Sequence, residues 1–179
     1  KMPGSGRLLF IDLSSGKNRL GGSALAQVFG QMGNESPDIE DADLLKRGFN
    51  AVQKLVGRRL LLSGHDRSDG GLITTLLEMA FAGNCGIDVN LPSESVHSGD
   101  PLAAFFSEEA GLVVEYLPEN EADIFEVLNK AGVPFIMVGK TAREKRIKVS
   151  LGWNCVLDED MRVLRDIWEE TSHQLDLLQ

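Results

Sequence analysis

Residues 112–138 constrain the fold most, because they contain two apolar stretches on either side of a short amphipathic segment. Residues 112–117 and 134–138 predict strands. Between them, Asn120 can cap a helix, and Gly132 closes it. One face of that helix carries Ile124, Phe125, Leu128 and Ala131. A compact β-α-β unit of this kind is typical of ferredoxin-like or α/β sandwich packing.

Strand and helix patterns alternate along the rest of the chain. Further strands are predicted at residues 8–13, 60–63, 85–91 and 146–151, and helices at 23–31, 39–58, 72–82, 101–109 and 158–178. The helix of residues 39–58 has one apolar stripe, formed by Leu45, Phe49, Val52 and Val56. A chain of 179 residues can bury one domain's core, so this alternation predicts one α/β domain.

Charge and composition exclude several classes of function. Lys and Arg number 18 against 27 Asp and Glu, a net charge of −9, which argues against a nucleic-acid partner but allows a small phosphate ligand. No apolar run approaches the roughly 20 residues of a membrane helix, so no membrane partner is predicted. Cys85 and Cys155 form no CxxC motif, and two buried thiols in a reducing cytosol are predicted; a disulfide or a catalytic thiol is the alternative.

The sharpest motif is Ser-Gly-His-Asp-Arg-Ser-Asp-Gly-Gly-Leu, residues 63–72. It follows a predicted buried strand and precedes a predicted buried helix. Open α/β sheets bind ligands at such strand ends, because the loop backbone and the helix N–H groups converge there. Gly70 and Gly71 allow unusual dihedral angles and close backbone approach. Ser68 or Asp69 can cap the helix, whose N–H groups and dipole favour an anion.

The residue types in this motif suit a magnesium-phosphate ligand. Asp66 offers carboxylate oxygens for Mg²⁺, and Arg67 can pair with a phosphate bidentately. The alternative is a well-capped helix with a tight turn, since the motif is neither a Walker A loop nor a GxGxxG fingerprint. Residues 20–23, with Lys17 and Arg19 nearby, form a second candidate anion site or a plain turn.

Three other features have competing interpretations. His65 is a general base, a metal ligand or a hydrogen-bond partner of a backbone carbonyl. The acidic residues between 38 and 43 favour a helix start through the dipole, with a metal site as the alternative. Trp153 and Trp168 are interpreted as packing anchors. No Ser-His-Asp or Cys-His pairing is recognisable, so no catalytic residue is predicted.

A family resemblance is carried by five segments: Leu-Phe-Ile-Asp-Leu (9–13), Gly-Lys-Asn-Arg-Leu-Gly-Gly-Ser-Ala-Leu-Ala-Gln (16–27), His-Asp-Arg-Ser-Asp-Gly-Gly-Leu (65–72), Glu-Met-Ala-Phe-Ala-Gly-Asn-Cys-Gly (78–86) and Trp-Glu-Glu-Thr-Ser (168–172). Their order and spacing resemble the large, single-chain phosphoribosylformylglycinamidine synthases of purine biosynthesis. Residues 90–100 and 141–146 agree least. The chain is similar to the second C-terminal-type domain of the synthetase portion, in the superfamily of aminoimidazole ribonucleotide synthetase and selenophosphate synthetase.

The resemblance implies an α/β (α+β) fold, a three-layer α/β/α sandwich with a mixed sheet, partly ferredoxin-like. We expect residues 1–179 to form a single domain, in which residues 158–179 form a terminal helix leading toward the next domain. The start at Lys1-Met2 also suggests a segment of a longer polypeptide. The expected partners are other domains of that polypeptide, the synthetase core and the glutaminase, in the cytoplasm.

The implied reaction is ATP-dependent. Formylglycinamide ribonucleotide and glutamine become the amidine, with release of ADP, phosphate and glutamate. The family pattern implies a magnesium ligand at Asp66 and an ATP contact at Ser68, and backbone geometry adds Gly70 and Gly71 as nucleotide-binding residues. The expected cofactors are Mg²⁺ and ATP or ADP, and the expected ligands are small and phosphorylated.

The resemblance also limits what this chain can do alone. The glutaminase segment is missing, so neither Cys85 nor Cys155 is assigned its nucleophile. The domain that supplies most ATP and magnesium contacts in the family is missing as well. The 179-residue chain is therefore expected to have no synthetase or glutaminase activity by itself. A non-catalytic structural module that holds an auxiliary Mg-nucleotide is the alternative function.

Overall fold

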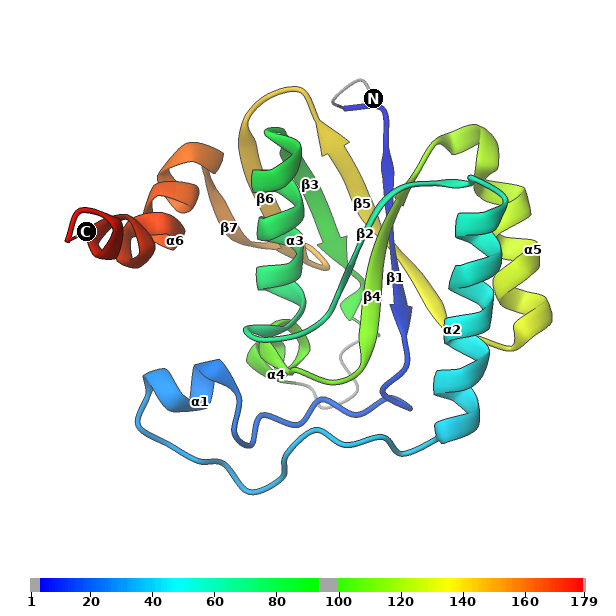
Figure 1. Cartoon of the computed structure of the whole chain (residues 1–179), viewed down its shortest axis with the longest axis horizontal. Helices are drawn as coiled ribbons and strands as arrows, with labels where there is room; N and C mark the ends of the chain where they lie inside the picture. The colour runs from blue at the N-terminus through cyan, green and yellow to red at the C-terminus, as the bar shows by residue number, and fades with distance from the viewer. Residues whose placement is uncertain (1–3, 94–99, 179) are drawn as a thin grey trace.

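The computed structural model describes residues 4–93 and 100–178, which form one seven-stranded sheet with helices packed around it (Figure 1). The strands are β1 (Arg7–Asp12), β2 (Leu61–Asp66), β3 (Gly86–Leu91), β4 (Gly111–Tyr116), β5 (Phe135–Ala142), β6 (Arg146–Leu151) and β7 (Asn154–Asp160). The helices are α1 (Ala24–Val28), α2 (Ala42–Gly57), α3 (Gly71–Gly83), α4 (Pro101–Phe106), α5 (Glu121–Ala131), α6 (Met161–Asp176) and the short 3-10 helix Pro118–Asn120.

The strand order is β2-β4-β1-β5-β3-β6-β7, and the sheet is mixed. β1 pairs antiparallel with both β4 and β5, so these two strands run parallel to each other with β1 between them. The predicted β-α-β unit of β4, α5 and β5 is therefore split by a central strand, as in ferredoxin-like folds. β3 and β6 pair in parallel, whereas the remaining neighbours are antiparallel.

Alternation along β1 divides the core into two layers. Leu8 and Phe10 face a cluster that includes Leu72 and Leu76 of α3, whereas Leu9 and Ile11 face a second cluster. The second cluster contains buried residues of α2 and α5: Leu44, Ala51, Leu55, Ile124, Val127 and Leu128. Helices thus cover both faces of the sheet, which confirms the three-layer mixed-sheet sandwich expected from the sequence.

The apolar stripe predicted on α2 is not its buried stripe, and of the predicted residues Val52 packs against the second cluster. The buried residues of α2 are instead Leu44, Gly48, Ala51 and Leu55. A Cβ at Gly48 would lie 2.6 Å from the Leu13 side chain, so small residues let α2 approach the sheet closely. Phe49, on the stripe predicted from the sequence, is 61% exposed.

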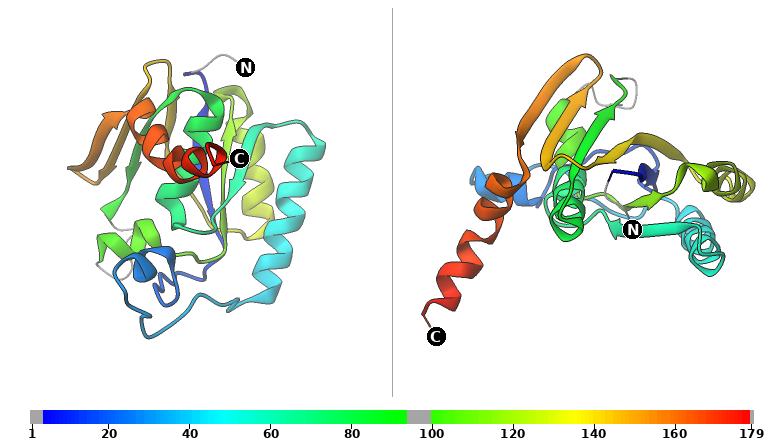
Figure 2. Two further views of the ribbon diagram at one scale, coloured as in Figure 1. Left: turned by 60° about the vertical axis from the view of Figure 1, so that its left-hand side comes forward. Right: turned by 90° about the horizontal axis from the view of Figure 1, so that it is seen from above.

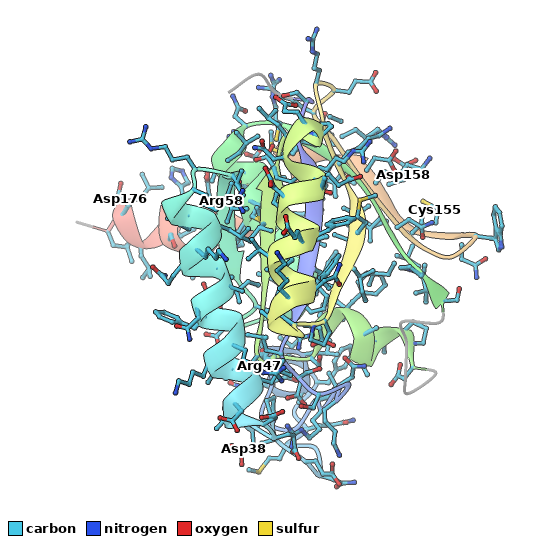
Figure 3. All side chains as sticks on the ribbon, turned by 90° about the vertical axis from the view of Figure 1, so that its right-hand side faces the viewer. Asp38, Arg47, Arg58, Cys155, Asp158 and Asp176 are labelled. Atoms are coloured by element: carbon cyan, nitrogen blue, oxygen red, sulfur yellow. The ribbon has the colours of Figure 1, made fainter. Side chains whose placement is uncertain are left out.

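Arg47 of α2 and Arg58, the C-cap residue that follows it, connect this helix to α5 (Figure 3). Arg58 Nη2 donates to Asp123 Oδ1 at 2.9 Å. Arg47 Nη1 donates to the carbonyl oxygens of Ala131 and Gly132, both at 3.1 Å. The contacts of Arg47 satisfy carbonyls at the end of α5, where a positive charge also interacts favourably with the helix dipole.

The C-terminal region differs from the prediction. Residues 154–160 form β7, so residues 158–160 belong to a strand and not to the predicted helix of residues 158–178. Helix α6 begins at Met161, where the Asp160 side chain accepts the N–H of Arg162. α6 projects away from the sheet (Figure 2). The prediction that Trp153 anchors packing is wrong, because its side chain is fully exposed between β6 and β7.

Smaller expectations also change. Asn120 does not cap α5 with its side chain, which donates to the carbonyl oxygen of Leu60 at 3.1 Å. Cys85 is buried as expected, but Cys155 is exposed on β7 (Figure 3), so the prediction of two buried thiols is wrong for it. Residues 94–99, within the segment that agrees least with the family, lie outside the described residues. Within the described part of the chain, no helix has the length and apolar content needed to cross a membrane.

Candidate functional site

The motif predicted to bind an anion lies where β2 ends and the chain turns into α3 (Figure 1). β2 continues further than predicted, so His65 and Asp66 are strand residues. Gly70 is the N-cap residue of α3, and Gly70 and Gly71 have φ angles of 80° and 72°. A Cβ at Gly71 would lie 2.7 Å from the carbonyl oxygen of Phe105, so this glycine brings the start of α3 against α4.

Asp66, Ser68 and Asp69 are exposed residues of the motif. The Asp66 side chain is 72% exposed, and its Oδ1 lies 3.4 Å from His65 Nδ1. Ser68 is also exposed, and its carbonyl oxygen accepts the N–H of Gly71 at 2.9 Å. A solvent-facing carboxylate fits one coordination position of Mg²⁺. The described residues contain no group of three His, Cys, Asp or Glu placed to hold a metal, so Asp66 would share the ion with phosphate, water or groups elsewhere.

The prediction that Ser68 or Asp69 caps α3 is wrong, because no side chain of the loop bonds the helix start. Glu108, which follows α4, lies there instead. Its Oε1 accepts the N–H of Gly70 at 2.8 Å and the N–H of Ala24, the first residue of α1, also at 2.8 Å. One carboxylate therefore accepts an N–H group of Gly70 in the first candidate segment and the N–H group of Ala24, directly after the second.

Arg67 is buried, so the expectation that it pairs with a phosphate is wrong. Only 5% of the residue is exposed, and its Nε and Nη2 donate to the carbonyl oxygens of Glu109 and Ala110 at 2.5 and 3.2 Å. The guanidinium lies 4.9 Å from the centre of the Phe10 ring and 3.6 Å from Asp12 Oδ1. Burial lowers the pKa of Arg67, and the nearby carboxylates oppose that shift. Its role is to tie the end of β2 to the adjacent strands.

Arg19, beside the second candidate anion site, also forms ion pairs with carboxylates of the same chain. Its Nε and Nη2 donate to the two carboxylate oxygens of Glu109 at 2.6 and 2.9 Å, and its Nη1 donates to Glu40 at 2.7 Å. Glu109 is 0% exposed, and its hydrogen bond raises the pKa of Arg19. Arg19 therefore does not support anion binding at residues 20–23, which form a turn before Ser23 caps α1.

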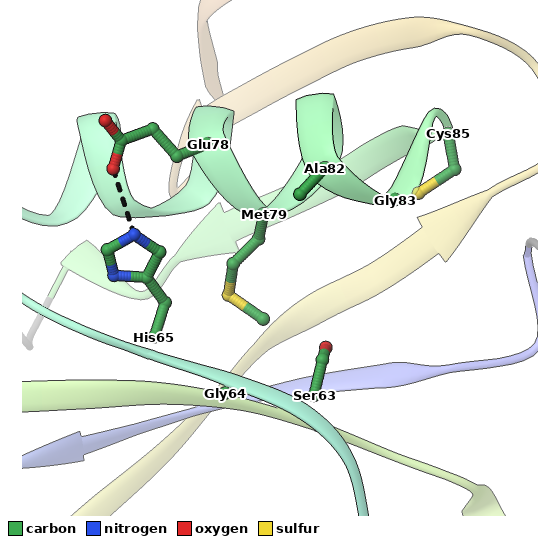
Figure 4. A pocket seen from close by; sticks show the side chains of 8 residues that line it. All are labelled: Ser63, Gly64, His65, Glu78, Met79, Ala82, Gly83 and Cys85. Carbon is green, nitrogen blue, oxygen red and sulfur yellow. Dashed lines mark ion pairs between the residues drawn. The ribbon is translucent and has the colours of Figure 1, made fainter.

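A hollow of about 400 Å³ lies between β2 and α3, next to the motif (Figure 4). His65 Nε2 lies 3.0 Å from Glu78 Oε2, and His65 Nδ1 lies 2.7 Å from the carbonyl oxygen of Asp66. Of the roles considered for His65, contact with a backbone carbonyl is the one the geometry shows. The side chain also links the end of β2 to α3.

The family described as AIR synthase related protein, C-terminal domain, matches residues 9–152. The chain belongs to this family. It is 46% identical to phosphoribosylformylglycinamidine synthase of Homo sapiens, over 98% of this chain and 13% of that protein. It is 47% identical to the probable phosphoribosylformylglycinamidine synthase, chloroplastic/mitochondrial, of Arabidopsis thaliana, over 97% of this chain and 12% of that protein. The chain thus spans about an eighth of the length of these relatives.

Solved structures share the fold of this AIR synthase related domain. "T. maritima PurL complexed with ATP" matches 92% of this chain and 26% of that chain, with a TM-score of 0.70 and 18% identity. Escherichia coli HypE, a hydrogenase maturation protein, matches 89% of this chain and 50% of that chain, with a TM-score of 0.58 and 16% identity. At such identities the likeness concerns the fold alone.

In this AIR synthase related domain, Glu108 and Glu109 contact the motif and its surroundings, although no sequence motif indicates them. Their partners Gly70, Ala24 and Arg19 lie 38, 84 and 90 residues away in the chain, and no local motif encodes contacts of that separation. The available signal is weak: two adjacent carboxylates follow the apolar helix α4. Only the packing of α4 against the start of α3 brings them to the motif.

Proposed function

We propose that this chain is one domain of a phosphoribosylformylglycinamidine synthase, an ATP-dependent carbon–nitrogen ligase of purine biosynthesis. The observation that carries the proposal is the 46–47% identity to the human and Arabidopsis synthases over nearly the whole chain. In the proposed reaction, formylglycinamide ribonucleotide and glutamine yield the amidine, ADP, phosphate and glutamate. The proposed partners are the synthetase core and the glutaminase, in other parts of a longer polypeptide. A cytoplasmic location stays a prediction.

Asp66 is proposed to bind Mg²⁺, and Ser68 to contact the nucleotide. Their exposure at the end of β2 supports these roles, as do related folds described as complexed with ATP and ADP. Gly70 and Gly71 are proposed to shape the nucleotide-binding turn. Their own N–H groups are bonded to Glu108 and to the Ser68 carbonyl, so they offer backbone shape rather than donors. When bound, Mg²⁺ would offset phosphate charge in this acidic chain.

An auxiliary site that holds a nucleotide without transferring its phosphate is the second candidate. Two observations favour it: among the described residues Asp66 lacks two further metal-ligating neighbours, and both Arg67 and Arg19 are committed to other groups. The site thus offers one candidate metal ligand and no free arginine for the phosphates. Such a site is suited to holding a nucleotide that stabilises the assembly.

Calorimetric titration with ADP and Mg²⁺ tests the site in the full-length synthase and in the 179-residue chain. Asp66→Asn removes a charged ligand, so we expect the affinity for Mg·ADP to fall roughly tenfold or more. Asp69→Asn, which changes another exposed carboxylate of the same loop, is the matched control and should leave the affinity unchanged. Equal affinity of the Asp66→Asn variant and the wild type would contradict the assignment.

Ammonia-dependent turnover of the full-length Asp66→Asn variant separates the two candidates. A fall in kcat indicates a catalytic nucleotide, whereas an unchanged kcat with lost nucleotide binding indicates an auxiliary one. The 179-residue chain alone should show no turnover with ammonia or glutamine. Measurable synthesis of the amidine by this chain would refute the proposal that it is an incomplete part of the enzyme.

A further inference from the structure

The sheet ends on one side at β2, whose outer edge is open. Among the described residues β2 pairs with β4 alone, and it lies between α2 and α3 (Figure 1). It contains neither Lys nor Pro and only one carboxylate, Asp66, at its end. At the opposite edge, β7 carries three consecutive carboxylates at residues 158–160. Charged residues on an edge strand oppose pairing with another chain, so β7 is protected in a way that β2 is not.

α2 presents its second apolar stripe beside this open edge. Phe49 and Val56 are 61% and 54% exposed, and Val52 is partly buried. A groove between α2 and β2 is lined by apolar residues of both elements and of β4: Val52, Val56, Leu61, Leu62, Leu112 and Val114. Contiguous apolar surface of this kind marks a site of interaction with another polypeptide segment.

Hollows lie on both sides of β2. The groove toward α2 and the hollow toward α3 (Figure 4) are both lined by Ser63, Gly64 and His65, so they lie on either side of the strand. A further hollow is lined by His65 and Glu78 and by Trp168 of α6, which is 53% exposed. We call these three hollows, which border β2 between α2 and α6, the apolar depression.

We propose that an extended, apolar segment of the same polypeptide, from outside residues 1–179, adds a strand to the open edge of β2 and occupies this depression. The proposal rests on the proposed function, in which this chain is one domain of a synthase whose relatives it covers by only 12–13%. An added strand pairs with the outward backbone groups of β2. Its side chains alternate between the two faces, one set reaching the groove of α2 and the other the hollow of α3.

Hydrogen–deuterium exchange of the full-length synthase and of the 179-residue chain tests the proposal. We expect the exchange rates of the β2 amides to be lower in the full-length protein than in the 179-residue chain, by a factor of about ten or more. Val56→Arg should remove that protection in the full-length protein, because it places a charge in the groove between α2 and β2. Val28→Arg, which changes a valine 82% exposed at the end of α1, is the matched control and should retain the protection. The 179-residue Val56→Arg variant should keep the melting temperature of the wild type, which shows that its fold is intact. If its melting temperature falls, the milder Val56→Gln variant replaces it.

Equal exchange of β2 in the two proteins would overturn the proposal, as would protection that survives Val56→Arg. Concentration-dependent dimers of the 179-residue chain that protect β2 would assign the edge to a second copy and overturn it as well. Ammonia-dependent activity is measured on the same full-length sample. An active synthase with an unprotected β2 refutes strand addition alone, whereas an inactive polypeptide refutes the proposed function.

Discussion

The Oε1 atom of Glu108 lies 2.8 Å from the backbone nitrogen of Gly70 and accepts its N–H at the start of α3. The same oxygen accepts the N–H of Ala24 at the start of α1. A negative charge is favoured at a helix N-terminus by the partial positive charge of the N–H groups there. Within this domain, the negatively charged group bound at the start of α3 is therefore the Glu108 side chain.

Glu108→Ala is expected to lower the free energy of unfolding by about 2 kcal/mol, because two N–H groups lose a charged acceptor. Glu108→Gln, which keeps an oxygen in place, should cost less. Urea denaturation measures both values. Glu119→Ala, which changes an exposed carboxylate of the 3-10 helix, is the control and should stay within about 0.5 kcal/mol of the wild type. Equal stability of the Glu108→Ala and Glu119→Ala variants would rule out this capping role.

Glu109→Gln is expected to destabilise the fold by about 3 kcal/mol, because the side chain is 0% exposed and forms a bidentate pair with Arg19. Screening by salt is weak for a buried pair, so the loss should persist at high ionic strength. Urea midpoints at low and high salt measure the effect. A loss that disappears in salt would indicate an exposed, weakly coupled pair instead.

Gly71→Ala should cost about 3 kcal/mol. Its φ of 72° is unfavourable for a residue with a Cβ, and that Cβ would meet backbone atoms of Phe105 and Phe106 at 2.6–2.7 Å. Gly57→Ala is the matched control, because no atom lies within 4 Å of the added Cβ at the end of α2. Alanine there should stabilise by up to about 1 kcal/mol. Thermal unfolding distinguishes the two, and similar melting temperatures would contradict the close approach of α3 and α4.

Ionisation of Tyr116 is expected to lower the free energy of unfolding at alkaline pH. Burial raises the pKa of Tyr116 above its ordinary value of 10.0, and the hydrogen bond that its hydroxyl donates to Glu121 Oε2 at 3.0 Å acts in the same direction. A folded-state pKa above the unfolded one means that this stabilisation is complete below pH 10.0 and is lost as the pH rises through the folded-state pKa. Tyr116→Phe should therefore flatten the decline in unfolding free energy above pH 10.0, measured by urea denaturation. Parallel declines in both proteins would count against this origin.

The split β-α-β unit is predictable because its signals are local. The apolar strands, the amphipathic helix and the glycine at residue 132, which adopts a φ of 60° at the end of α5, all depend on near neighbours in the chain. β7 is not predictable in the same way. Its acidic end resembles a helix start, and pairing with β6 makes it a strand, supported by the Arg146–Asp158 ion pair at 2.5 Å.

The candidate site also combines features that depend on near neighbours in the chain with features that depend on distant ones. The sequence alone indicates the turn after residues 60–63, the Asp66 carboxylate as a candidate ligand and the glycines at the start of the next helix, since each depends on residue types within one short segment. Tertiary structure alone decided that Gly70 bonds Glu108 and that Arg67 is buried, because the partners of Gly70 and Arg67 come from the distant segment after α4. It also decided which stripe of α2 meets the core. Burial depends on how closely two surfaces can approach, and Gly48 allows the closer contact, which leaves the bulkier stripe in solvent beside β2.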